Sequence, residues 1–259
     1  MSSSHDVIYR IEGRTLAHGL LVCALALALG YFTTDAYVAA LGIDYLESGN
    51  QYLRHLAIIK GHGGDPWQYR MLAPYLLKSV IALNEWLAVS QPHARAFIYF
   101  RHWQDVCVLV TAYVYYRHLD LSAPAALLGM GLLAWGMAHS NFDSDLQFST
   151  FFDVLFYLLA GLCIVRGWWR WLVPLTVLAA LNRESSGFMP LLLLAAAHVA
   201  TPASRWREAL PTVALALACY VGVFLGLRLL YGTQDLMLPY GHKPGLDILA
   251  YNLLRSVTF

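Results

Sequence analysis

Three carboxylates follow the first apolar segment of the chain: Asp35, Asp44 and Glu47. A carboxylate at the edge of an apolar surface can act as a general base and take a proton from an acceptor hydroxyl. Partial burial would raise its pKa toward the range in which such a base works. Solvated loop carboxylates have the same spacing, and spacing alone favours that simpler interpretation. The sequence therefore nominates three candidate bases without choosing among them.

An arginine lies in the aromatic segment PWQYRMLAP, residues 66–74. The guanidinium of Arg70 is suited to binding a phosphate through two parallel hydrogen bonds. Trp67 and Tyr69 are residue types that favour the headgroup level of a bilayer. Arg70 and Tyr69 are therefore candidate ligands for a lipid phosphate. The alternative is that Arg70 only anchors and positions the helix that follows.

A second polar segment, Asn182-Arg183-Glu184-Ser185, interrupts a long apolar run. Ionisable residues between two apolar segments are costly to bury, so they indicate function by default. Arg183 is a candidate phosphate ligand, Glu184 can orient it, and Asn182 belongs to the same group. The alternative is a structural salt bridge that closes a helical hairpin.

Two aspartates, Asp143 and Asp145, form a DxD-like pair in the segment FDSDLQF. Two such carboxylates can hold a divalent cation, which would in turn hold a diphosphate. This pattern is short and common, and it favours the simpler interpretation of a solvated turn in which Asp145 caps the next helix. A divalent cation is therefore the only cofactor that the sequence suggests. The cysteines lie in apolar runs without CxxC spacing, which indicates free thiols.

The composition decides what kind of protein must position these residues. The chain has 259 residues, of which 59% are hydrophobic and 13% charged. Ordinary globular chains are ~45–50% apolar and ~25% charged. With 17 basic and 16 acidic residues the net charge is +1, so there is no basic surplus for gripping a nucleic acid. These values exclude a soluble globular protein, a disordered chain and a nucleic-acid binder, and leave a polytopic helical membrane protein.

The apolar pattern predicts an all-α fold with about seven transmembrane helices and one interfacial amphipathic helix, in a single transmembrane domain of residues 1–259. The first apolar run lacks a cleavage site and is interpreted as a retained helix. One run, 171–200, is too long for one untilted span and is expected to form two short helices that meet at the polar segment 182–185. The expected spans are 16–33, 97–116, 123–138, 148–165, the two helices within 171–200, and 210–231.

The long segment between the first two spans is expected to be structured. Residues 34–70 are rich in aromatic and aliphatic residues, so disorder is not expected there. Residues 44–60 are predicted to form an amphipathic helix. Residues 71–90 carry Lys78, Asn84 and Glu85, which are costly at the centre of a bilayer, so this helix is expected to lie in the interface. Residues 34–100 would together form the first outer loop. The predicted apolar face of the 44–60 helix is Leu46, Tyr52, Leu53, Leu56 and Ile59.

The short basic loops indicate the orientation of the helices. These basic loops all lie on one side of the membrane only if residues 71–90 do not cross it. The loops are residues 1–14, 117–122, 166–170 and 201–208. The opposite, outer side then carries residues 34–100, residues 139–147, the break at 182–185 and an outer C-terminal segment, 232–259. The N-terminus is accordingly expected to be cytoplasmic.

The order of these motifs resembles that in bacterial membrane glycosyltransferases of the GT-C type. The resemblance rests on an acidic loop after the first helix, the segment QYRMLAP (68–74), the acidic segment FDSDL (142–146) and LNRES (181–185) before an apolar run. It covers roughly residues 16–230. No sharp motif follows the acidic residues of the first loop, so the resemblance leaves open which of them corresponds to the family's base.

The resemblance implies an inverting transferase in the bacterial inner membrane, which moves a sugar from a polyprenyl-phosphate donor on the outer face. It implies that Asp44 or Glu47 is the catalytic base, with Asp35 as a third candidate. It also implies that Arg70 and Arg183 bind the donor phosphate, with a polyprenyl-phosphate lipid as partner. A second hypothesis is a non-enzymatic accessory subunit with a membrane-protein partner, or a small transporter.

Overall fold

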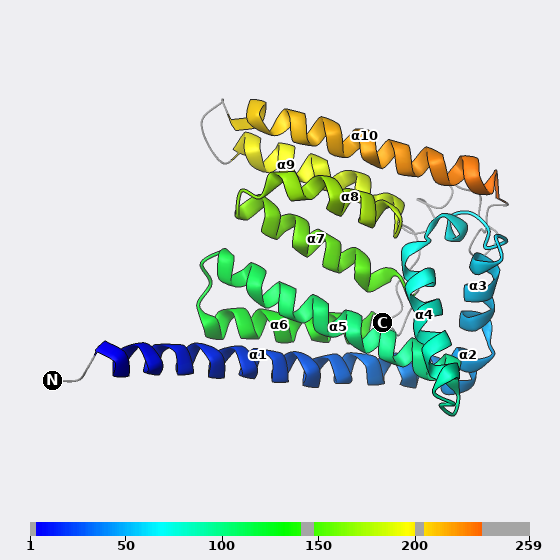
Figure 1. Cartoon of the computed structure of the whole chain (residues 1–259), viewed down its shortest axis with the longest axis horizontal. Coiled ribbons are helices and arrows are strands. Elements are labelled where there is room, and N and C mark those ends of the chain that lie inside the picture. The colour runs from blue at the N-terminus through cyan, green and yellow to red at the C-terminus, as the bar shows by residue number, and fades with distance from the viewer. Residues whose placement is uncertain (1–3, 141–147, 200–204, 235–259) are drawn as a thin grey trace, which may run out of the picture.

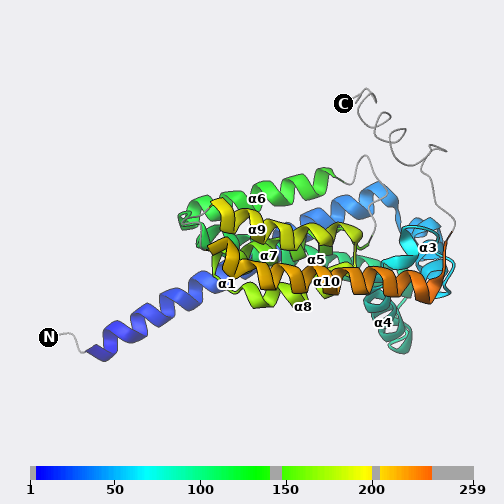
Figure 2. The ribbon, with the colours of Figure 1, turned by 90° about the horizontal axis from the view of Figure 1, so that it is seen from above.

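The computed structural model describes residues 4–140, 148–199 and 205–234, and its regular elements within these ranges are all helical. Seven helices run along a common axis and are stacked side by side (Figures 1 and 2). In chain order they are α1 (Ser4–Leu41), α5 (Pro92–His118), α6 (Ala123–His139), α7 (Thr150–Val165), α8 (Leu172–Ala180), α9 (Phe188–Val199) and α10 (Arg205–Tyr231).

Three further helices gather at one end of the stack: α2 (Ile43–Glu47), α3 (Asn50–Ile59) and α4 (Leu72–Trp86). Both views show α4 running across the common axis (Figures 1 and 2). Three short 3₁₀ turns complete the structure: η1 (Trp67–Tyr69), η2 (Trp169–Trp171) and η3 (Glu184–Gly187). We call the end that carries α2, α3, α4, η1 and η3 the α4 end. The opposite end carries η2 and the basic turns.

The first helix is longer than the predicted span of 16–33. Its apolar sequence continues to Leu41 without a helix breaker, and the helix stops before Gly42, whose φ of +83° favours glycine. Asp35 consequently lies on α1 rather than in a loop, and its side chain is exposed. The prediction that an extramembrane loop begins at residue 34 is wrong in this respect.

The predicted helix over residues 44–60 is divided into α2 and α3. The break is at Gly49, where a Cβ would lie 2.7 Å from the Cα of Tyr45, a contact that only glycine avoids. The predicted apolar face is also only partly correct, because Leu53 is 55% exposed. The buried face of α3 is mainly polar and consists of Gln51, His55 and Ile58.

The break predicted within residues 171–200 is present, since α8 and α9 are separate helices joined through η3. Two stretches in the described residues are long and apolar enough to cross a membrane by length and composition, Leu16–Leu41 and Trp206–Tyr231. The other apolar helices are shorter. The expectation of about seven spans therefore stays a prediction.

The core lies around α5, which packs against α1, α4, α6 and α7, while α10 packs on α8 and α9. Small residues permit close approach: a Cβ at Gly161 of α7 would lie 2.9 Å from the ring of Tyr115. The interior also holds charge. Asp105 is fully buried and accepts hydrogen bonds from Thr33 at 2.6 Å and Thr34 at 3.1 Å, which tie α5 to α1.

Candidate functional site

The two polar motifs singled out in the sequence meet at the α4 end. Arg70 lies between η1 and α4 and Glu184 begins η3, 114 residues further along the chain. The Nε and Nη2 atoms of Arg70 donate to one oxygen of Glu184 at 3.3 and 3.1 Å. A backbone hydrogen bond of 2.9 Å from Leu72 N to Leu181 O joins the same two segments. The sequence motifs around residues 70 and 184 thus form one site.

The Arg70 side chain is only 12% exposed, and the carboxylate of Glu184 is 26% exposed. Burial lowers the pKa of Arg70 from its usual value, and Glu184 opposes this shift. An arginine keeps its charge in proteins, so a half-buried cation is held here by one carboxylate. The indole of Trp67 lies 4.9 Å from the Arg70 guanidinium and adds a cation–π contact.

The neighbouring arginine is held more loosely. Arg183 Nη1 lies 3.5 Å from an oxygen of Asp153, in the first turn of α7, and the Arg183 side chain is 36% exposed. Its partner Asp153 is 14% exposed. Ser185 Oγ donates to the same Asp153 oxygen at 3.0 Å. Asp153 would thus keep a hydrogen bond if the more exposed Arg183 turned to another anion.

Hydrogen bonds from three other segments fix the backbone between α8 and α9. The hydroxyl of Tyr157 donates to Ser185 O at 2.6 Å, and that of Tyr220 on α10 donates to Glu184 O at 2.8 Å. The buried Asn182 donates from Nδ2 to Ser149 O at 3.1 Å. The role of Asn182 in this structure is thus to hold the segment that presents Arg183 and Glu184.

Two more arginines contact the aromatic side chains of η1, Trp67 and Tyr69. Arg228, near the end of α10, stacks on Tyr69 at 4.3 Å and on Phe224 at 3.5 Å. Tyr69 is buried and its hydroxyl donates to Gly232 O at 2.8 Å. Tyr69, a predicted ligand, therefore has a structural partner in the described residues.

Arg54 on α3 lies 5.2 Å from the Trp67 ring that also contacts Arg70. We call Arg54, Arg70, Arg183 and Arg228, with Asp153 and Glu184, the arginine cluster. Among the described residues of this cluster, Arg70, Arg183 and Arg228 outnumber the carboxylates of Asp153 and Glu184, which favours an anionic ligand.

Of the predicted bases of the first loop, Glu47 has partners at the start of α5 and Asp44 is exposed. Glu47 accepts the backbone N–H of Ala94 at 2.8 Å and pairs with His93 at 3.2 Å. It thereby satisfies a free N–H in the first turn of α5. Asp44 is exposed in the first turn of α2. The ion pairs of Arg70 and Arg183 are made with Glu184 and Asp153 instead.

Asp143 and Asp145 lie outside the described residues, so their predicted cation site stays a prediction. Within the described residues, no group of three or more His, Cys, Asp or Glu side chains is arranged to hold a metal ion.

The first-loop helices contain a buried histidine that the sequence analysis did not single out. His55 is 2% exposed and packs edge-on against Phe97 and Phe148. Burial lowers its pKa to about 4, and the nearby positive charges of His93 and Lys78 add to the shift. The available signal was its position four residues after Gln51, on what proved to be the buried face of α3.

Comparison with known proteins provides no analogy for this arrangement. No protein-family model, curated protein or solved structure matches the chain. The functional argument therefore depends on the chemistry of the arginine cluster.

Proposed function

We propose that the chain is a multi-pass membrane protein whose arginine cluster binds the phosphate of a polyprenyl-phosphate lipid. The observation that carries the proposal is the meeting of Arg70 and Arg183, from distant segments, at one end of the helix stack. A guanidinium pair binds phosphate oxygens with matched geometry. Each arginine already holds a carboxylate, and a phosphate would take the place of that weaker partner.

Exposed apolar side chains support placement in a membrane. Leu128 and Leu132 on α6 are 66% and 64% exposed, and Leu229 on α10 is 86% exposed. Large apolar surfaces of this kind are rare on soluble monomers and are expected where lipid contacts the helices. About seven spans would then run along the common axis, with α4 in the outer interface and the N-terminus in the cytoplasm of a bacterium.

The fuller proposal is a GT-C-like transferase that moves a sugar from the bound polyprenyl phosphate to an acceptor on the outer face of the inner membrane. Asp44, Glu47 and Asp35 remain its candidate bases. Of these, Asp44 and Asp35 have exposed side chains, whereas Glu47 holds the start of α5. A base at Asp44 or Asp35 would have to be brought to the donor by binding.

The test of the transfer step is the amount of polyprenyl-linked sugar in membranes of source cells. Cells that lack the protein should accumulate the donor, and the wild-type chain should restore the normal amount. Replacement of the true base, by Asp44→Asn, Glu47→Gln or Asp35→Asn, should leave the donor accumulated although the protein is present and folded. If all three variants return the amount of donor to the wild-type level, the transfer mechanism is wrong.

A second candidate function is an accessory subunit that binds the lipid without reacting with it. The observation that favours it is that Arg70 and Arg183 pair with Glu184 and Asp153 rather than with a first-loop carboxylate. In that case Asp44→Asn, Glu47→Gln and Asp35→Asn would behave as the wild type does. Replacement of Arg70 would still weaken the complex with the partner protein. Co-purification of a membrane-protein partner that is lost with Arg70→Gln would identify this function.

A further inference from the structure

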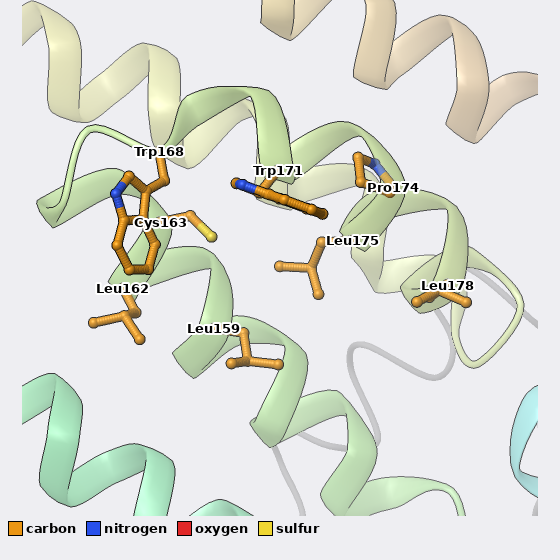
Figure 3. A pocket seen from close by; sticks show the side chains of 8 residues that line it. All are labelled: Leu159, Leu162, Cys163, Trp168, Trp171, Pro174, Leu175 and Leu178. Atoms are coloured by element: carbon orange, nitrogen blue, oxygen red, sulfur yellow. The ribbon is translucent and has the colours of Figure 1, made fainter.

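An apolar groove begins at the end of the molecule opposite the arginine cluster and extends along α8 as far as Leu178. It runs between α7 and α8 and has a volume of about 520 Å³ (Figure 3). This volume is within the range of small-molecule sites, about 300–1,000 Å³. Its lining is apolar apart from one thiol and consists of Leu159, Leu162, Cys163, Trp168, Trp171, Pro174, Leu175 and Leu178.

The groove is open to its surroundings along the helices. Trp171 is 67% exposed and Leu178 is 46% exposed. These two residues are seven positions apart, so the wall that α8 provides is about 10 Å long. Figure 3 shows the indoles of Trp168 and Trp171 near the turn and Leu178 further along α8. An elongated hydrocarbon chain suits this shape better than a compact ligand.

The turn at the mouth of the groove is basic. Arg166 and Arg170 are both exposed, and the Arg166 guanidinium lies 5.0 Å from the Trp168 ring that lines the groove. The sequence between Asp153 and Glu184 has no acidic residue. Indoles favour the headgroup level of a bilayer, and arginines there attract anionic lipid. The mouth is thus complementary to a phosphate, and the groove to the chain attached to it.

We propose that this groove is a binding site for an anionic phospholipid. One acyl chain lies between α7 and α8, and its phosphate is held by Arg166 and Arg170. The ligand is a phospholipid without an ammonium group, because such a group would repel the two arginines. The proposal uses the membrane placement argued above but not the transfer reaction, since Arg166 and Arg170 lie at the opposite end of α8 from Arg183.

The test is native mass spectrometry of the purified full chain with phosphatidylglycerol or phosphatidylcholine of identical acyl chains. Each arginine at a lipid surface favours an anionic lipid by a few-fold, so wild-type protein should bind phosphatidylglycerol about tenfold more tightly. The double variant Arg166→Gln/Arg170→Gln should reduce the preference to less than about twofold. Equal binding of the two lipids by the wild type would overturn the proposal.

A matched control separates this site from general attraction to basic loops. Arg117 is exposed at the same end, where its guanidinium donates to Leu121 O at 2.7 Å, outside the groove. Arg117→Gln should leave the lipid preference unchanged. An effect as large as that of the double variant would contradict a specific site. Leu178→Gln, on the exposed wall of the groove, should weaken the binding of both lipids several-fold. Unchanged binding would show that no acyl chain occupies the groove.

Discussion

The α4 end of the molecule presents two groups of charged residues that the sequence nominates and the structure treats differently. The arginine cluster brings together η1, η3, α7 and α10 through ion pairs and tyrosine hydrogen bonds. The first-loop acids are dispersed: Asp35 and Asp44 are exposed, and Glu47 holds the start of α5. Residue type and spacing find charged groups, but their contacts decide which of them can act together.

The largest expected effect concerns the buried histidine of the first loop. The pKa of His55 is about 4 in the folded protein, whereas that of an unfolded histidine is about 6.5. The unfolded state binds more protons between these values, so stability is full above about pH 6.5 and falls as the pH drops to 4. We expect a loss of about 3 kcal/mol over this window, measured by unfolding in detergent at a series of pH values. His55→Leu should flatten the profile, and an unchanged profile would assign the pH dependence to other groups.

The next effect distinguishes the two arginines of the cluster. Arg70→Gln leaves the half-buried Glu184 without its cation and should lower the free energy of unfolding by about 2 kcal/mol. Arg183→Gln should cost less, about 1 kcal/mol, because Arg183 itself is 36% exposed and Asp153 keeps its hydrogen bond from Ser185. Thermal unfolding of both variants and of Glu184→Gln checks the difference. Equal losses for the two arginines would show that the burial of Arg70 is unimportant.

A smaller effect on the free energy of unfolding is expected for replacement of Glu47. Its carboxylate accepts the Ala94 N–H and faces His93, so Glu47→Gln, which removes the negative charge at the start of α5, should reduce the free energy of unfolding by up to about 1 kcal/mol. Ser185→Ala, which removes a neutral hydrogen-bond donor from Asp153, is a matched comparison in the arginine cluster. A Glu47→Gln protein as stable as the wild type would remove the structural role given to this carboxylate and strengthen its candidacy as a base.

The smallest effects are expected at the exposed acids. Asp35→Asn and Asp44→Asn should change the free energy of unfolding by no more than about 0.5 kcal/mol, as is usual for surface positions. Circular dichroism melting checks this. Any loss of donor turnover in these variants can then be assigned to chemistry. A large loss of stability would mean that these side chains have contacts that their exposure does not indicate.

The sequence predicted the helical class and the break between α8 and α9, because apolar period and polar interruptions are local signals. It also identified Arg70 and Glu184, but not that they touch, since their contact depends on how α4 and η3 fold back on each other. It missed the division at Gly49 and the polar buried face of α3. Both are set by packing: the backbone of Tyr45 leaves no space for a side chain at residue 49, and Phe97 and Phe148 enclose His55.

The central claim is that the arginine cluster binds a lipid phosphate, and polyprenyl-phosphate affinity in detergent tests it most directly. Arg70→Gln and Arg183→Gln should each weaken binding about tenfold or more, because a charge-assisted hydrogen bond is worth ~1.5–3 kcal/mol. Arg95 is an exposed arginine at the start of α5 and donates a hydrogen bond to Ser90. The Arg95→Gln variant should bind polyprenyl phosphate as tightly as the wild type does. Glu184→Gln should bind more tightly, because it frees Arg70 from its carboxylate. Unchanged affinity in both arginine variants, with no gain for Glu184→Gln, would show that these ion pairs are structural and contradict the proposal.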